Sequence, residues 1–235
     1  MNKTSEQGSA ADRRGTSSVL RRPARLGDEA YGAIFERIMS LEIPPGARIT
    51  VDGMARELGV SQTPIREALA RLESEGLVNK QHLIGYSAAP QMSRKQFYDT
   101  YELRLLLEPA TAAKAARVIT DEALTELENL AAEMGDLDKS DKPQAYARFA
   151  QLDTNFHDQI AKIAGNTLVV EALERLHTQV HLFRLLFHSR VTAEALGEHR
   201  HILEALRHRD PAATEAAMRD HVLRSQDRFK AQYPA

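Results

Sequence analysis

The spacing of hydrophobic residues divides the chain into two regions. In the first, residues 28–90, apolar positions at helical spacing predict three helices, and a short apolar run around a glycine predicts a β-hairpin. The helices begin near Asp28, Val51 and Ser61, and the hairpin covers residues 77–90. A helix, a short helix, a tight turn, a longer helix and a hairpin follow one another in the order of a winged helix-turn-helix.

After Pro90 only long helical periods remain. They predict six helices joined by short loops, over residues 93–117, 121–138, 143–164, 166–190, 192–208 and 211–231. Helices of this length with short connections pack as an antiparallel bundle. The sequence therefore predicts a mainly α protein, in which a winged helix-turn-helix of three helices and a β-hairpin wing (28–90) precedes an all-α antiparallel helical bundle (91–235).

The composition indicates the cellular compartment in which the protein is expected to work. The chain contains no cysteine, and no apolar run approaches the roughly 20 residues needed to span a bilayer. The absence of cysteine excludes disulfides, thiolate zinc sites and cysteine nucleophiles, and it is compatible with a reducing cytoplasm. We therefore expect a cytoplasmic protein without membrane contact.

Charge is unevenly distributed, although the net charge is only −2. Residues 1–27 carry six Lys and Arg against two Asp and Glu, a surplus of +4, and they are rich in Ser, Gly and Ala without an apolar period. This composition predicts a disordered basic tail. Such a tail suits an arm that lies near DNA, although chance charge on a disordered segment explains it equally well.

Residues at the start of the third helix, and in the hairpin, suit DNA contact. A helix N-terminus presents free N–H groups and a positive dipole end to phosphates, and arginine or lysine can grip bases or the backbone. The candidate DNA-binding residues are Ser61, Gln62, Thr63, Arg66, Lys80 and His82. Each also has a structural explanation, since Ser61 and Thr63 can cap the helix, Arg66 can pair with Glu67 or Glu73, and His82 can be an ordinary loop residue. In their order along one segment they favour DNA binding.

Three stretches of this region carry a specific resemblance: Pro45-Gly46-Ala47-Arg48-Ile49, the run from Leu58 to Leu69, and the run from Leu72 to Val78. Together they resemble the GntR family of repressors, in which a segment like Ser61–Leu69 opens the recognition helix. Thr63 and Arg66 match that segment. The sequence departs from it at Gln62, where an arginine that contacts DNA is common, and at Asp52, where some relatives carry another such arginine. These departures do not change the fold that the resemblance implies, but they mean that the operator sequence typical of the family cannot be assumed for this protein.

Four residues with metal-ligating side chains fall on apolar stripes of the second region. Asp153 and His157 lie one turn apart on one predicted helix, and His199 and His221 lie on the last two. Burying a carboxylate and three imidazoles is costly unless a divalent metal or hydrogen bonds compensate. Spacing alone leaves both explanations open.

Other histidines are weaker candidates. His201 and His208 fall off the apolar stripe of their helix, and His177 and His181 form a competing pair at i, i+4 that lacks an evident third partner.

A second resemblance is carried by Tyr101-Glu102-Leu103-Arg104 with Glu108, Phe156-His157 followed by Gly165-Asn166, Glu198-His199-Arg200, and Met218 with His221. These stretches are similar to the FCD ligand-binding domain of the FadR-type GntR subfamily, and six helices resemble its VanR-type subgroup. The resemblance implies a divalent metal held by Asp153, His157, His199 and His221, with zinc expected first and nickel or manganese as alternatives. It also implies that Arg104 helps to hold the acid group of an effector, whereas an ordinary salt bridge with Glu108 is the competing explanation.

The expected function is that of a homodimeric transcription regulator, most simply a repressor, that binds a pseudo-palindromic double-stranded DNA operator. A small carboxylate at the metal site would modulate this binding. One alternative is a metal-dependent hydrolase joined to a DNA-binding domain, although the sequence has no H-E-x-x-H motif and offers no Glu on the apolar stripes beside the ligands as a general base. Another is a dedicated metal sensor. We expect no enzymatic activity.

Overall fold

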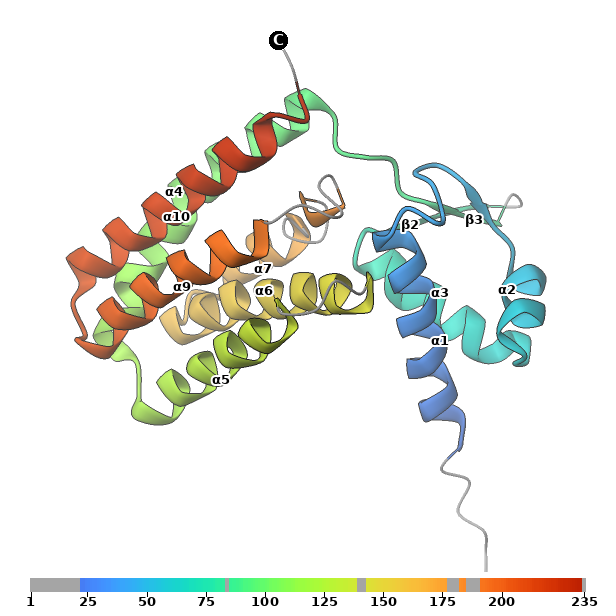
Figure 1. Cartoon of the computed structure of the whole chain (residues 1–235), viewed down its shortest axis with the longest axis horizontal. Helices are drawn as coiled ribbons and strands as arrows, with labels where there is room; N and C mark the ends of the chain where they lie inside the picture. Colours follow the sequence, from blue (N-terminus) through green and yellow to red (C-terminus); the bar gives the residue numbers. More distant parts are fainter. Residues whose placement is uncertain (1–21, 83–84, 139–142, 177–181, 185–190, 234–235) are drawn as a thin grey trace, which may run out of the picture.

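The computed structural model describes residues 22–82, 85–138, 143–176, 182–184 and 191–233, which form two domains (Figure 1). Most of the predicted basic tail lies outside these residues. The elements of the N-terminal domain are α1 (Arg22–Met39), β1 (Arg48–Ile49), α2 (Val51–Leu58), α3 (Gln62–Ser74), β2 (Val78–Gln81) and β3 (Gly85–Ala88). Those of the C-terminal domain are α4 (Arg94–Val118), α5 (Asp121–Leu137), α6 (Pro143–Ala164), α7 (Thr167–Leu176), α9 (Val191–Arg207) and α10 (Pro211–Lys230).

The N-terminal domain is a winged helix-turn-helix, as the sequence predicts. Its core lies between α1 and α3, whose apolar stripes face each other. The fully buried residues of these stripes are Ile34, Ile38, Ile65, Leu69 and Leu72. Gly59 ends α2 with φ of 67°, a left-handed conformation that glycine adopts without a Cβ penalty. This tight turn sets the start of α3 on the exposed side of the domain.

The wing contains one strand more than the predicted hairpin. β3 pairs antiparallel with both β2 and β1, so that the sheet order is β1-β3-β2. The two residues of β1 are too few to give a periodic signal, and Ile49 is fixed by burial and by pairing with Tyr86.

The helical domain packs around α4 and α10, which lie side by side along most of their length (Figure 1). A capping box starts α4, because the Ser93 side chain accepts from Gln96 N–H and the Gln96 side chain accepts from Ser93 N–H. The helices at 94–118, 121–137, 143–164, 191–207 and 211–230 agree with prediction within one residue at each end.

Two predicted boundaries are wrong. α1 begins at Arg22 rather than at Asp28, and Pro23 lies in its first turn, where the N–H that proline lacks has no partner within the helix. The predicted helix at 166–190 is helical at Thr167–Leu176 and at Leu182–Phe183, but Arg184 is in a turn, so a single helix does not run to residue 190; residues 177–181 and 185–190 lie outside the described part.

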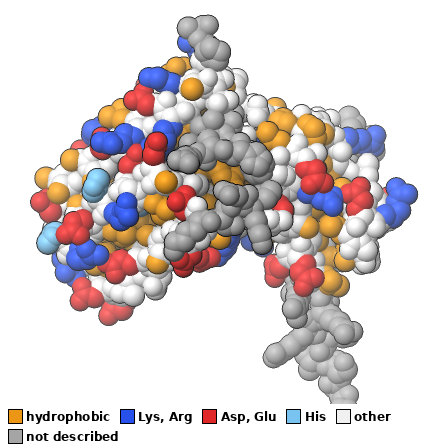
Figure 2. All heavy atoms as spheres, in the orientation of Figure 1, with side chains coloured by type: hydrophobic (Ala, Val, Ile, Leu, Met, Phe, Trp, Pro, Cys, Tyr) orange, Lys and Arg blue, Asp and Glu red, His pale blue; other side chains and the backbone are white. Residues whose placement is uncertain are grey.

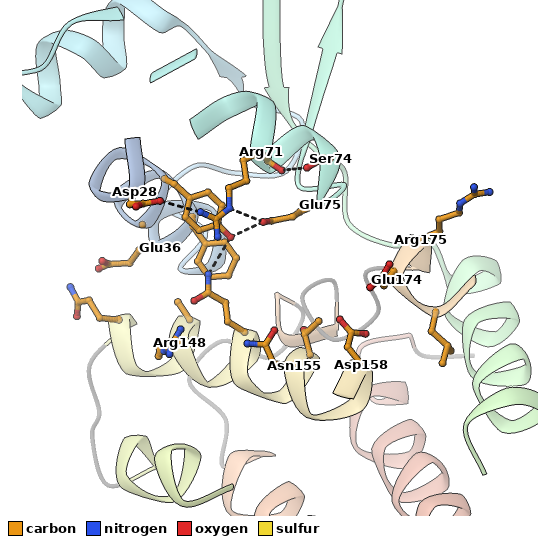
Figure 3. A pocket seen from close by; sticks show the side chains of 18 of the residues that line it. Asp28, Glu36, Arg71, Ser74, Glu75, Arg148, Asn155, Asp158, Glu174 and Arg175 are labelled. Carbon is orange, nitrogen blue, oxygen red and sulfur yellow. Dashed lines mark hydrogen bonds and ion pairs between the residues drawn. The ribbon is translucent and has the colours of Figure 1, made fainter. Parts of the chain in front are cut away.

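Among the described residues, the two domains contact each other in the following ways. α1 packs against α6, where Gln151 Nε2 donates to Tyr31 Oη over 3.2 Å. Arg184 Nη2 donates to the backbone carbonyl of Ala89, in the linker between β3 and α4, over 3.0 Å. Beside the Tyr31 contact lies a cleft of about 930 Å³, lined by residues of α1, α3, α6 and α7 (Figure 3). Among the described residues, no helix has both the length and the apolarity to cross a membrane.

The buried stripe of α3 predicts a stability effect. Leu72 is fully buried, so Leu72→Ala is expected to lower the free energy of unfolding by about 2–5 kcal/mol through lost apolar contact and a residual cavity. Leu168→Ala is the matched control, because Leu168 is 74% exposed and its truncation is expected to change stability by about 0.5 kcal/mol or less. Urea unfolding followed by circular dichroism measures both, and equal effects would contradict the described packing.

Candidate metal centre and DNA-facing surface

The four predicted metal ligands come together inside the helical domain. α6 presents Asp153 and His157 one turn apart, α9 presents His199 and α10 presents His221, and all four side chains are buried. One ring nitrogen from each of the three histidines lies within 4.8 Å of the others. The structure therefore brings together every residue that the sequence assigned to this site.

Two carboxylates favour one tautomer of two of these histidines in their neutral form. His157 Nδ1 lies 2.8 Å from Glu108 Oε2, and His221 Nδ1 lies 2.8 Å from Glu198 Oε2. An ionised carboxylate only accepts hydrogen bonds, so the proton of each neutral imidazole belongs on Nδ1. The Nε2 atoms of His157 and His221 then face each other with their lone pairs, 3.1 Å apart.

Two opposed lone pairs at this distance need a proton or a metal ion between them. Two imidazoles on one zinc ion, each about 2.0–2.1 Å from the metal, have nitrogens about 3.3 Å apart at a tetrahedral angle. A single shared proton would satisfy only His157 and His221. The neighbouring His199 and Asp153 would keep their own unmet hydrogen-bonding capacity, and a metal ion serves all four.

Asp153 and His199, together with Nε of Arg228, supply buried polar atoms without a hydrogen-bond partner at this site. Asp153 Oδ1 and both ring nitrogens of His199 make no hydrogen bond, although His199 Nε2 lies only 3.3 Å from Asp153 Oδ1. Burial raises the pKa of Asp153, and it lowers the pKa values of His199 and His221 well below their usual range. Both imidazoles are therefore neutral at pH 7, which is the form that binds metals.

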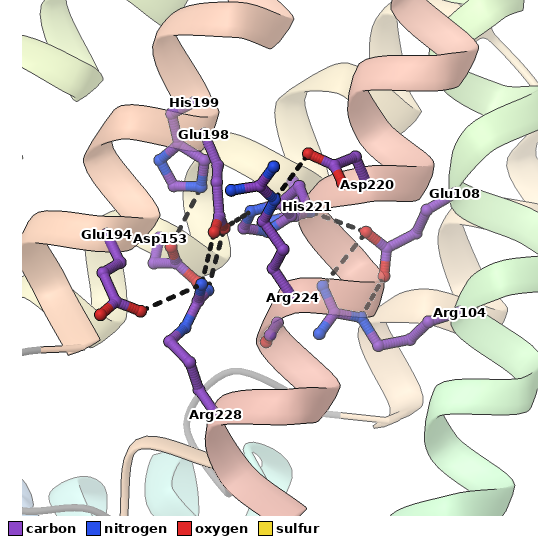
Figure 4. Close-up of polar contacts among 12 residues, drawn as sticks. Arg104, Glu108, Asp153, Glu194, Glu198, His199, Asp220, His221, Arg224 and Arg228 are labelled. Atoms are coloured by element: carbon purple, nitrogen blue, oxygen red, sulfur yellow. Dashed lines mark hydrogen bonds and ion pairs between the residues drawn. The ribbon is translucent and has the colours of Figure 1, made fainter.

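Two arginines, the buried Arg104 and the partly buried Arg228, hold the orienting carboxylates in place (Figure 4). Arg104 Nε and Nη2 donate to Glu108 at 2.5 and 3.3 Å, and Arg228 Nη1 and Nη2 donate to Glu198 at 2.5 and 2.9 Å. Burial opposes ionisation of Glu108, but Arg104 and His157 outweigh it and hold the pKa of this carboxyl far below its usual range. His157 and His221 are thus each the inner end of an arginine–carboxylate–histidine chain.

Part of this arrangement is not evident from the sequence. Glu198 precedes His199 directly but is not on the apolar stripe that marks the ligands, and Arg228 carries no spacing signal at all. The expectation that no Glu lies beside the ligands is wrong, because Glu108 and Glu198 both do. Each is already engaged by an arginine and a histidine, which leaves neither in the free, proton-accepting state that a general base needs.

A small cavity adjoins the centre. Arg104, Asp153, His221 and Arg228 supply its polar wall, and Leu182 and Phe183 form part of its apolar wall. Its volume is about 10 Å³, which is room for about one water molecule. Arg104 therefore lies where an effector role would need it and also makes the predicted salt bridge with Glu108.

The predicted DNA-binding residues are all exposed. Ser61, Gln62, Thr63 and Arg66 are exposed at the N-terminal end of α3, and Lys80 and His82 are exposed on the wing. Ser61 is the N-cap by position, but its side chain makes no capping hydrogen bond, so its hydroxyl is available to a phosphate. Arg66 Nη2 donates to Gln62 Oε1, not to Glu67 or Glu73 as the structural explanation supposed.

Surface charge is mixed. On the face drawn in Figure 2, Lys and Arg side chains alternate with Asp and Glu over both domains. Among the described residues, the face drawn in Figure 2 therefore presents no broad positive field. Of the weaker histidine candidates, His201 and His208 are exposed, and His177 and His181 lie outside the described residues.

Known families match both domains. Residues 26–86 match the bacterial regulatory proteins of the gntR family, and residues 99–224 match the FCD domain. The chain is 28% identical over 205 residues to the HTH-type transcriptional repressor RspR of Escherichia coli, with 84% of this chain and 86% of that protein covered. It is also 28% identical over 208 residues to a probable D-xylose utilization operon transcriptional repressor of Paenarthrobacter nicotinovorans, covering 88% and 89%.

Solved structures show the same fold. Escherichia coli McbR/YncC superposes with a TM-score of 0.67 at 20% identity, covering 89% of this chain and 99% of that one. A GntR-type putative transcriptional regulator from Rhodococcus superposes with a TM-score of 0.66 at 18% identity, covering 90% and 100%. The FCD match spans more than half of the chain and the gntR match covers its winged helix-turn-helix, so the protein belongs to the GntR family of transcription regulators, with an FCD domain as its C-terminal part.

Proposed function

We propose that the protein is a cytoplasmic repressor that binds a pseudo-palindromic DNA operator as a homodimer and responds to a small organic acid at a metal site in its FCD domain. Twofold symmetry would present two α3 helices to successive major-groove half-sites. Two relatives of similar length are named as repressors, which supports this direction of control.

The observation that carries the metal proposal is the contact between His157 Nε2 and His221 Nε2. Both atoms face inward as lone-pair donors, and Asp153 and His199 complete a set of three nitrogens and one oxygen. This donor set suits zinc first, with nickel or manganese as alternatives. The metal would supply a Lewis-acidic centre with open positions for water or a carboxylate.

Charge around the centre favours an anionic effector. Arg104 and Arg228 are neutralised by their carboxylates, so a divalent cation beside the single negative charge of Asp153 would leave a positive excess. Both guanidinium groups lie in the cavity wall, where they can orient a bound carboxylate.

An organic acid needs more room than the cavity offers, so part of its wall must move. Most of the wall belongs to the long helices α4, α6, α9 and α10, and the exception is Leu182–Phe183. The next residue, Arg184, holds the carbonyl of Ala89 in the linker, and Ala89 N–H in turn donates to Leu77 O at the base of the wing. This chain of contacts is a direct route from the cavity to the DNA-binding domain.

DNA binding is tested first on duplex DNA from the protein's own promoter region. Arg66→Ala is expected to weaken binding to that DNA by about 1–3 kcal/mol through loss of a guanidinium at the groove. Arg219→Ala is the control, because Arg219 pairs with Glu215 on the exposed side of α10. Fluorescence anisotropy at several salt concentrations measures both, and a wild-type protein that does not prefer this DNA over a random duplex would contradict the repressor function.

The metal site is tested by removing one ligand. His199→Ala is expected to abolish bound metal in elemental analysis, together with the rise in melting temperature that a matching organic acid gives the wild type. His201→Ala, an exposed histidine on the same helix, should leave both unchanged. Full metal content in His199→Ala would contradict the site.

The same samples separate the alternatives. Metal that survives dialysis indicates a cofactor, whereas metal that exchanges at cellular concentrations would indicate a metal sensor. Turnover of esters or amides by the zinc-loaded protein would indicate a hydrolase.

The route through Arg184 gives a separate prediction. Its side chain is buried and its Nε and Nη1 have no hydrogen-bond partner, so Arg184→Met should fold normally. The variant is expected to keep the acid-induced rise in melting temperature and to lose most of the change in DNA affinity, which in allosteric proteins is about 5- to 150-fold. An unchanged response of DNA binding to the acid would show that coupling takes another path.

A further inference from the structure

Three side chains form a chain of hydrogen bonds across the corner between α2 and α3. Gln62 Nε2, at the start of α3, donates to Asp52 Oδ1 on α2 over 2.5 Å. Arg66 Nη2, one turn further along α3, donates to Gln62 Oε1 over 3.1 Å. All three residues are exposed, and two of them are DNA-binding candidates.

The direction of this chain is fixed by its two ends. An ionised carboxylate has no proton to donate, and a guanidinium has no lone pair with which to accept. The amide nitrogen of Gln62 must therefore face Asp52, and its oxygen must face Arg66. The usual ambiguity in the orientation of a glutamine amide does not arise here.

The anchor of the chain is held in place by its own helix. Asp52 lies in the first turn of α2, where the helix dipole favours a negative charge. Thr50 caps this helix through Gly53 N–H, and Arg56 Nε donates to the carbonyl of Asp52 over 3.3 Å. Since α2 packs directly on α3, the carboxylate is a fixed point relative to the recognition helix.

We propose that Asp52 is a specificity-determining residue, which positions Gln62 and Arg66 for reading base edges without touching the DNA itself. The inference rests on the proposed DNA-binding function. Arginine paired with guanine is the commonest specific contact in the major groove, and a guanidinium that is already oriented loses less conformational freedom on binding.

The charge of Asp52 acts in the same direction. A carboxylate beside the N-terminus of α3 repels phosphates, and phosphate contact is the main source of affinity for DNA of any sequence. Asp52 therefore lowers binding to random DNA while it favours the correctly read site. Specificity is the difference between these two affinities. Asp52 increases this difference by raising the affinity for the correct site and by lowering the affinity for random DNA.

The test separates the hydrogen bond of Asp52 from its charge. A random duplex DNA library is selected with the wild type, Asp52→Ala, Asp52→Asn and Arg66→Ala, and the affinities for the selected duplex and for a random duplex are then compared. Asp52→Asn removes the charge but keeps an oxygen that can accept from Gln62 Nε2. Thermal unfolding of each variant verifies that this exposed substitution leaves the fold intact.

Both Asp52 variants are expected to bind random DNA several-fold more tightly than the wild type, because a charge that repels phosphates is gone. Asp52→Ala is expected to lose about tenfold in preference for the selected duplex, at the same guanine positions that Arg66→Ala affects. Asp52→Asn should lose only the several-fold part that comes from tighter binding to random DNA, and it should still select the same guanines as the wild type.

Three results would overturn the inference. The first is an unchanged preference in Asp52→Ala. The second is an equal loss in Asp52→Asn and Asp52→Ala, which would leave charge as the whole effect. The third is a loss confined to one cytosine, which would mean that the carboxylate reads that base directly. A wild type that selects no sequence would instead refute the proposed function on which the inference rests.

Discussion

The helical domain depends on one constraint, which is that three imidazoles and a carboxylate share a buried space that they cannot satisfy among themselves. Glu108 and Glu198 favour the neutral tautomers of His157 and His221 that carry the proton on the outer ring nitrogens and leave the inner ones as opposed lone pairs. These carboxylates are themselves buried, and burying their charge would cost free energy if Arg104 and Arg228 did not pair with them. Removing an arginine would therefore leave a buried carboxylate without its ion-pair partner and would weaken the orientation of the histidine that it contacts. The polar groups in the core of the domain thus depend on one another.

The same constraint links the candidate centre to the DNA-binding domain, because α6 serves both. Its inner face supplies Asp153 and His157, and two residues before Asp153 the side chain of Gln151 reaches out to Tyr31 on α1. Tyr31 also donates to Glu75 at the end of α3 and lies under the guanidinium of Arg71. Through Tyr31, α6 is thus connected to both helices that form the core of the winged domain. The contact of Arg184 with the linker is a second connection, made from the cavity wall.

The sequence predicted the helices and the four inward-facing ligands well, because helical period and apolar stripes are local signals. α2 begins and ends where its pattern does, and Asp153 and His157 needed only their i, i+4 spacing. What it could not predict is set by contacts between distant residues. The pairing of Ile49 with Tyr86, the partner of His221 on another helix and the role of Arg228 all join positions that no short window contains together. The resemblance named Arg104 as an effector residue, and only the fold shows that its guanidinium also holds the carboxylate behind His157.

The two candidate sites use the same chemistry in opposite surroundings. In the core, arginine, carboxylate and imidazole form a chain whose direction is set by which groups can donate, and burial makes each missing partner expensive. On the surface, Arg66, Gln62 and Asp52 form a chain with the same logic, but water competes for every bond and the chain adds little to stability. Its value would arise when DNA excludes that water, since groups already in place then lose least on binding. A buried chain can therefore support the fold at all times, whereas an exposed one matters only in the complex.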